Sequence, residues 1–299
     1  MYNQIASNKR KTILLIIVFV AVIFGLAWGL AGFYGEEYYI YFPLAIIISV
    51  VMTLVSYFSS DKVALKMSAA RGPVSKEENA YVYRMVENLC ITAGLPLPKI
   101  YLIDSPAINA FACGRNPQHS SIALTHGAIE KLTNEELEGV IAHELSHVKN
   151  YDILVMTIII ILVGIITIVT DIFFRSQLYG RGLHRSSSNN RGGNPLMLIG
   201  FVLMILSPII AQLIKLAISR KREFLADASG SLLTRYPEGL ARALEKIRDD
   251  SNQLEKVSEA TAHLFISSPL KGKTLARLFS THPPLEERIQ ALRQMGNIK

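Results

Sequence analysis

The sequence has few charged residues and very little cysteine, and each shortage excludes a class of protein. Charged side chains make up 18% of the 299 residues, against about 25% in a typical soluble protein. Two cysteines, Cys90 and Cys113, are too few for a disulfide framework or a cysteine-based zinc site, and they fit a reducing compartment. The net charge of +7 raises the question of nucleic acid, but the chain carries no RNA- or DNA-binding motif. We therefore expect no nucleic-acid partner.

Charge is scarcest in four apolar runs, each close to the roughly 20 residues that a membrane-spanning helix needs. The runs are Ile13–Phe33, Tyr38–Phe58, Ile153–Phe174 and Leu196–Ser219. The first run is longer than the apolar core of a cleaved signal peptide, so it is predicted to remain as an anchor. Basic residues cluster beside the runs, as in anchors that face anionic lipid. The lipid bilayer is therefore an expected partner.

These runs predict a multi-pass membrane protein in four parts. Residues 1–58 form an N-terminal transmembrane hairpin, 59–152 a cytoplasmic part, 153–219 a second transmembrane hairpin, and 220–299 a second cytoplasmic part. The positive-inside rule places the N-terminus and both soluble parts in the cytoplasm. The arginine-rich loop 175–195 conflicts with this scheme, which puts it outside. Either the last two runs do not fully span, or the other loops dominate.

Local patterns in the soluble parts predict helices and a few strands. Ser75 is expected to cap a helix that ends near Gly94. Thr133 and Glu136 form a capping box that opens a helix through Asp152. Strands are predicted for Lys99–Ile103, Asn109–Cys113 and Ser121–Thr125. Amphipathic helices are predicted for Pro237–Asp250 and Pro284–Met295. The fold class is α+β, mainly helical, with a small β-sheet and about four transmembrane helices.

The helix that the capping box opens contains His143-Glu144-Leu145-Ser146-His147, an H-E-x-x-H pattern. Positions i and i+4 share one face of a helix, so both imidazoles can reach one ion with Glu144 beside it. This is a zinc-hydrolase signature in which the glutamate acts as general base. The alternative, two solvated histidines beside a surface glutamate, is disfavoured by the helical context.

A catalytic zinc site needs a third protein ligand and an open position for water. Just after the fourth run, Glu223 and Asp227 share one predicted helix face. Glu223 could complete a His2Glu site, and Asp227 could accept a hydrogen bond from a zinc-bound imidazole and fix its tautomer. By spacing alone, an acidic pair that balances Arg220–Arg222 is an equally good interpretation.

The order of motifs resembles the HtpX-type membrane zinc endopeptidases, a family related to the Ste-type CAAX prenyl proteases. After H-E-x-x-H come Glu223-Phe224-Leu225-Ala226-Asp227 and then Thr281-His282-Pro283-Pro284-Leu285-Glu286-Glu287-Arg288. Asn109–Gly114 resembles the family's N-A-F-A motif, with Cys113 where threonine is usual. A small buried residue is the favoured interpretation of Cys113, over a redox or metal role.

The resemblance implies a zincin-like metalloprotease domain with one zinc ion, held by His143, His147 and Glu223, and with Glu144 catalytic. It implies a bacterial inner-membrane protein whose active site faces the cytoplasm. It also implies a stress-related quality-control role against damaged or misfolded membrane proteins. Membrane-protein substrates are therefore expected partners, and other membrane quality-control proteases are further candidates.

Three weaker site predictions follow from the chemistry of such a centre. His282 is a candidate donor to the oxyanion, or else a turn residue before a helix. Asp152, an acid at a predicted helix C-terminus, opposes the helix dipole and should either orient the site or cap the following span. Asn109, Ala110 and Phe111 offer an edge on which an extended substrate could pair, or they form an ordinary core strand.

Two other functions stay open at this point. One is a processing protease for a specific lipidated or peptide substrate, which the prenyl-protease kinship allows. The other is an inactive membrane scaffold, although a scaffold has no need of the general base Glu144.

Overall fold

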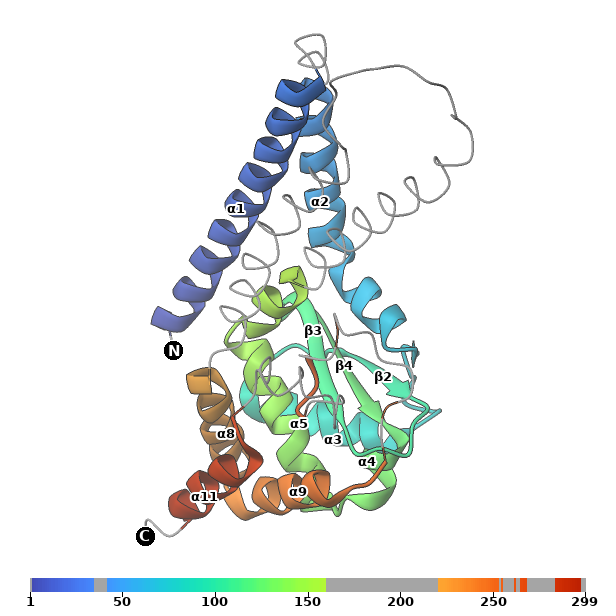
Figure 1. Ribbon diagram of the computed structural model, residues 1–299. Coiled ribbons are helices and arrows are strands. Elements are labelled where there is room, and N and C mark those ends of the chain that lie inside the picture. Colours follow the sequence, from blue (N-terminus) through green and yellow to red (C-terminus); the bar gives the residue numbers. More distant parts are fainter. Residues whose placement is uncertain are drawn as a thin grey trace.

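The computed structural model describes residues 2–34, 42–159, 220–252, 254, 261, 264–267 and 283–296. Helices α1 (Tyr2–Tyr34) and α2 (Phe42–Met67) include most of the first two apolar runs and project together from the rest of the molecule (Figure 1). Within these described ranges, no helix combines the length and the apolar character needed to cross a membrane. Most of the third run, the fourth run and the arginine-rich loop lie outside the described residues.

One mixed four-stranded sheet, in the order β1-β2-β4-β3, forms the centre of the described fold. Strand β2 (Lys99–Ile103) pairs antiparallel with β1 (Ala70–Arg71) and parallel with β4 (His119–Thr125), which pairs antiparallel with β3 (Ala110–Asn116). The three predicted strands are confirmed, and two of them are longer than expected. Strand β1 was not predicted, because two residues cannot show a period-two pattern.

Both faces of the sheet are covered by apolar side chains. Successive side chains of β3 point to opposite faces. Ala110 and Ala112 face the larger core, which also takes side chains from α3 (Ala80–Ala93), α5 (Asn134–Lys149) and α9 (Pro237–Asp249). Phe111 and Cys113 face a second core with the end of α2 and Phe265. The two alanines leave room for α5 to lie close to the edge strand.

Helix α3 begins later than the sequence predicted. Asn79 is its cap, and the Asn79 side chain accepts a hydrogen bond from the Val82 N–H. Ser75 and Glu78 instead close a separate turn, in which the Ser75 N–H donates to Glu78 Oε2. An Asx cap one turn downstream therefore competed successfully with the predicted serine cap. The predicted end at Gly94 is confirmed, with φ of 66° in the left-handed region.

Helix α5 starts as predicted and ends earlier than predicted. The capping box of Thr133 and Glu136 is present in full. The helix ends at Lys149, because Tyr151 adopts a left-handed conformation with φ of 60°, and residues 152–159 form a new helical segment. On one continuous helix, positions 147 and 152 would lie about 140° apart around the axis. The break therefore allows Asp152 to turn back toward His147.

The C-terminal helices complete the fold: the first two pack on α5, and the last packs on those two. They are α8 (Arg220–Thr234), α9 and α11 (Leu285–Gly296), and the short α4 (His126–Lys131) follows the sheet (Figure 1). Both predicted amphipathic helices, now α9 and α11, are confirmed. Helix α8 crosses α5 so closely that a Cβ on Gly230 would lie 2.9 Å from the His143 backbone nitrogen. A glycine at this position is what lets the two helices touch.

Candidate active site

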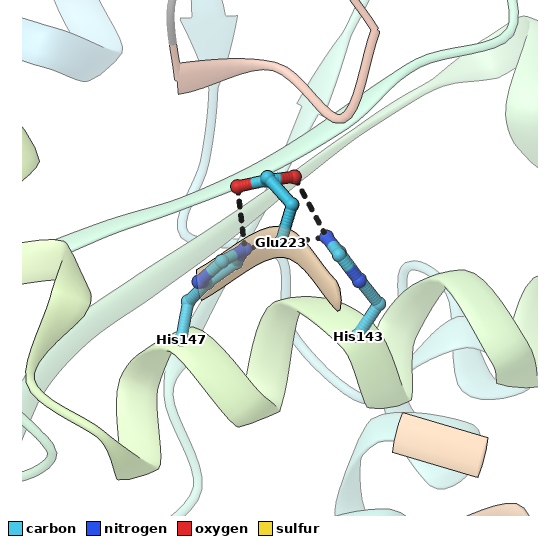
Figure 2. Close-up of side chains that lie close together, drawn as sticks. All are labelled: His143, His147 and Glu223. Atoms are coloured by element: carbon cyan, nitrogen blue, oxygen red, sulfur yellow. Dashed lines mark hydrogen bonds and ion pairs between the residues drawn. The ribbon is translucent and has the colours of Figure 1, made fainter. Parts of the chain in front are cut away.

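The contact of α5 with α8 brings three potential metal ligands together inside the protein. His143 and His147 project from one face of α5, and Glu223 reaches across them from α8 (Figure 2). The two Nε2 atoms lie 3.2 Å apart. Glu223 Oε2 is 3.8 Å from His143 Nε2, and Glu223 Oε1 is 3.6 Å from His147 Nε2. All three side chains are buried, so the site is shielded from bulk solvent.

These distances fit a single tetrahedral metal ion. Ligand atoms about 2.0–2.1 Å from zinc, at tetrahedral angles, lie roughly 3.3 Å from one another. The separations of 3.2, 3.6 and 3.8 Å are close to that value. Two imidazoles and one carboxylate form the His2Glu donor set of catalytic zinc sites, with one position left for water. Among the described residues, this is the one group of three that could hold a metal.

His143 is oriented from its far side by elements of the C-terminal part. Its Nδ1 atom lies 2.9 Å from Asp227 Oδ1, so the carboxylate fixes the tautomer that leaves Nε2 available. The guanidinium of Arg288, from α11, donates to both oxygens of Asp227, at 2.8 and 2.7 Å. Arg288 also donates to the Ile266 carbonyl oxygen and is fully buried. A bidentate pair of this kind holds the carboxylate rigidly.

His147 is oriented by a different set of residues. Its Nδ1 atom lies 3.1 Å from Asp152 Oδ2, just beyond the break in the helix. The other Asp152 oxygen accepts hydrogen bonds from Asn8 Nδ2 of α1, at 2.7 Å, and from Arg222 Nη1 of α8, at 3.4 Å. Asp152 thus contacts the site directly, as one of the two sequence interpretations expected.

Burial and neighbouring charges act differently on the two imidazoles. Burial lowers the pKa of His143, and the carboxylate of Asp227 only partly offsets it. Burial also opposes charge on His147, but the hydrogen bond to Asp152 and the charge of Glu223 prevail and raise its pKa to about 9. The carboxylates that favour a proton on His147 favour a divalent cation at the same place. The electrostatics of the cluster therefore suit a metal ion.

Glu144 lies beside the histidines, where the sequence placed it. Burial raises its pKa to about 7, although the His147 charge opposes that shift. The backbone N–H of Ala112, on the edge strand β3, donates a hydrogen bond to its carboxylate. A buried glutamate with a pKa near neutrality is suited to accept and then return a proton.

The predicted substrate edge on β3 already has partners within the chain. The Ala110 carbonyl oxygen accepts from the Ile266 N–H, and Asn109 Nδ2 donates to the Ser267 carbonyl oxygen. The Phe111 ring is buried and packs edge-on against Phe265, with ring centroids 4.9 Å apart. Residues 264–267 therefore lie along the start of this edge.

The two remaining predictions have different outcomes. Cys113 is buried, and burial raises the pKa of its thiol, so it behaves as the small core residue that the sequence favoured. His282, the predicted oxyanion donor, lies outside the described residues.

Sequence reasoning missed Arg288 and Asn8 as parts of this site. A signal for Arg288 was present, because Leu285, Ile289 and Leu292 form the apolar stripe of α11 and Arg288 lies on the same face. A charged residue on a buried stripe requires a charged partner. Asn8 carried no such signal, because its partners lie more than a hundred positions away in the sequence.

Comparison with known proteins agrees with this geometry. The model of a protein family described as "Peptidase family M48" matches residues 76–296, which include His143, His147 and Glu223. The chain belongs to peptidase family M48. As a member of this family it is a metallopeptidase, an enzyme that hydrolyses peptide bonds.

Several proteins named "Protease HtpX homolog" are similar to this M48 peptidase over nearly its full length. The protein of Tropheryma whipplei (strain TW08/27) is 44% identical over 99% of both chains. That of Dictyoglomus turgidum (strain DSM 6724 / Z-1310) is 41% identical over 99% of this chain and 95% of its own. Among solved structures, the crystal structure of S. mikatae Ste24p matches with 20% identity and a TM-score of 0.48, over 98% of this chain and 66% of its own. The family match and the HtpX homologues confirm the family resemblance seen in the sequence.

Proposed function

We propose that this M48 peptidase is a zinc-dependent integral-membrane endopeptidase that cleaves damaged or misfolded membrane proteins at their cytoplasmic side. The observation that carries the proposal is the buried cluster of His143, His147 and Glu223 with Glu144 beside it. The donor set favours zinc over harder cations, which prefer oxygen ligands alone.

The chain's own residues divide the catalytic work. His143, His147 and Glu223 would hold the ion. When bound, zinc would lower the pKa of a water molecule toward neutrality and polarise the scissile carbonyl. Glu144 would remove a proton from the attacking water and deliver it to the leaving amine, a role that its raised pKa suits.

The acids behind the two imidazoles keep the Nε2 lone pairs directed at the ion. Asp227 and Asp152 each lie on the Nδ1 side of one histidine. Since Nδ1 then carries the proton, Nε2 stays free to bind metal. Burial of the whole cluster limits the access of bulk water, which strengthens each of these electrostatic interactions.

A membrane location is supported by the apolar runs and by the surface of the first two helices. Large apolar side chains are exposed along both, including Ile13, Ile17, Ile47, Leu54 and Phe58. Exposed apolar surface on this scale marks contact with lipid or with a partner. The metal cluster and the first turns of α1 meet at Asp152, so we place the site near the cytoplasmic membrane surface, with substrates cut in juxtamembrane or cytoplasmic loops.

The test uses the full chain, purified in detergent under chelator and then supplied with zinc and an unfolded membrane-protein substrate. We expect cleavage to require zinc. Glu144→Gln should lower kcat by about 10²- to 10⁴-fold, the usual contribution of general acid–base catalysis, while it still binds metal.

The substrate arm compares the same cleavable loop with and without a membrane segment. Equal rates on both would contradict the membrane-substrate proposal. Cleavage of one lipidated peptide alone, across a broad panel, would favour the processing protease. Failure to bind zinc at all would refute the assignment of the metal ligands.

A further inference from the structure

The N-terminal helix makes direct contact with the support of the metal site. Asn8, near the start of α1, is buried although the next two residues, Lys9 and Arg10, are exposed. Its Nδ2 atom donates two hydrogen bonds, one to the Asn150 carbonyl oxygen at 2.9 Å and one to Asp152 Oδ1 at 2.7 Å. An amide nitrogen carries two protons, so both are used at this one place.

Both acceptors lie at the break that ends α5. The Asn150 carbonyl belongs to the cap of that helix, where backbone oxygens have lost their intrahelical partners. Tyr151 follows in the left-handed conformation. The Lys9 ammonium lies 4.8 Å above the Tyr151 ring, which is a second contact of α1 with the same turn. Helix α1 thus holds the turn that points Asp152 at His147.

The contacts run without interruption from α1 to His147, one of the three potential metal ligands. Asn8 binds one oxygen of Asp152, and the other oxygen faces His147 Nδ1 at 3.1 Å. A carboxylate held at one oxygen cannot rotate freely about its terminal bond. The Arg222 contact to the same oxygen, at 3.4 Å, is longer than the Asn8 contact.

We propose that Asn8 is a positioning residue of the metal site, and that docking of α1 on the end of α5 is needed for His147 to bind metal at full strength. This inference rests on the proposed metallopeptidase function. It makes the N-terminal helix part of the active-site support as well as an anchor. Displacement of α1 then weakens the site without a change in any ligand.

The test replaces Asn8 and a matched neighbour in the full chain, in detergent. Asn8→Leu removes the amide at similar volume. The control is Thr12→Val, one turn further along α1, because Thr12 is buried and its Oγ1 forms no hydrogen bond within the described part of the chain. Cobalt is titrated into each protein in a Glu144→Gln background, and the visible spectrum reports the ligand geometry.

We expect Asn8→Leu to weaken cobalt and zinc binding roughly 3- to 10-fold, less than the 10- to 100-fold typical of a direct partner of a ligating histidine. The cobalt bands should shift. In the active background, kcat should fall with little change in KM. Thr12→Val should leave all three measurements unchanged. Equal metal affinity and an identical spectrum in Asn8→Leu would overturn the proposal, as would equal losses in both variants.

A double-mutant cycle covers the possibility that Asn8→Leu folds poorly. Asn8→Asp sets a carboxylate against Asp152 and should bind metal more weakly than Asn8→Leu. Adding Asp152→Asn restores one donor and one acceptor between positions 8 and 152, so the double variant should lose less metal affinity than the product of the two single losses. Single losses that simply multiply in the double variant would contradict the proposed contact. If the unaltered chain binds no metal, the proposed function itself fails, an outcome distinct from these.

Discussion

The two histidines of the candidate metal site stand one turn apart on the same helix, yet they are supported in different ways. His143 is backed by Asp227, whose carboxylate is held by two hydrogen bonds from the buried Arg288. His147 is backed by Asp152, which is held by the neutral amide of Asn8 and, at longer range, by Arg222. The first support comes from the C-terminal helices, and the second depends on α1.

The difference shows how one site can combine a fixed ligand with an adjustable one. The Arg288 charge outweighs the effect of burial and lowers the pKa of Asp227 to about 2, so that acid stays ionised. Breaking a buried pair of this kind leaves an uncompensated charge. A neutral amide contact is weaker, and after its loss Asp152 still has His147 and Arg222 as partners. We therefore expect the His143 side to govern folding and the His147 side to tune metal affinity.

The largest loss of folding stability should come from removal of the Arg288 side chain. Arg288→Met leaves Asp227 charged and buried, and should lower the free energy of unfolding by about 3–5 kcal/mol. Denaturant unfolding of the metal-free protein measures this. Arg293→Met on the same helix is the control, since Arg293 pairs at the surface with Glu238 and Glu245, and this variant should lose much less stability. Similar losses in both variants would contradict the expectation that the His143 side governs folding.

Amide substitutions of Asp152 and Asp227 test whether the two acids differ in their effects on metal affinity and on stability. Asp152→Asn should weaken metal binding by about 10- to 100-fold with a small change in the stability of the metal-free protein. Asp227→Asn should reduce metal binding at least as much and also destabilise the metal-free protein, because Arg288 loses its nearer charged partner and keeps Glu223, at 3.6 Å. Metal titration and thermal unfolding separate the two quantities. Indistinguishable profiles would mean that both acids play the same part.

The close contact of α5 and α8 sets the distance from the histidines to Glu223. Gly230→Ala places a Cβ 2.9 Å from the His143 backbone nitrogen, so α8 must move away. Overpacking should destabilise by about 1–3 kcal/mol, partly offset by roughly 1 kcal/mol of helix propensity, and metal affinity should fall. Gly296→Ala is the control, because no described residue beyond the chain neighbours lies within 4 Å of the added Cβ. Unchanged metal affinity in Gly230→Ala would show that α8 can move away from α5 without a loss of metal binding.

The smallest loss of folding stability should come from removal of the ion pair between Glu238 of α9 and Arg293 of α11. A hydrogen bond from Arg293 is the main cause that lowers the pKa of Glu238 below its usual 4.5. An acid with a lowered pKa adds stability above its unfolded value, and that stability is lost as pH falls through the folded value. Glu238→Gln should therefore lose less than about 1 kcal/mol at neutral pH and converge with the native protein in acid.

Urea unfolding at several pH values tests this prediction. Glu287→Gln, an exposed substitution with the same change of charge, is the control. A difference between Glu238→Gln and the native protein that grows as pH falls would have the wrong sign.

Some features of this protein follow from the sequence by itself. The capping box at Thr133, strands β2, β3 and β4 and the amphipathic helices were predictable because each depends on neighbours a few positions away. The shared face of His143 and His147 follows from helical period alone. The apolar runs, and the order of motifs that resembles a peptidase family, could be read in the same way.

The supports behind the candidate ligands depend on contacts between distant parts of the chain. Spacing left Glu223 and Asp227 with two equal interpretations, and the approach of α8 at Gly230 resolved their placement, with Glu223 beside both imidazoles and Asp227 behind His143. The break at Tyr151 turns Asp152 toward His147. Asn8 and Arg288, from opposite ends of the chain, contact Asp152 and Asp227. The physical reason is that burial and ion pairing act through space, between residues whose separation along the chain carries no periodic signal.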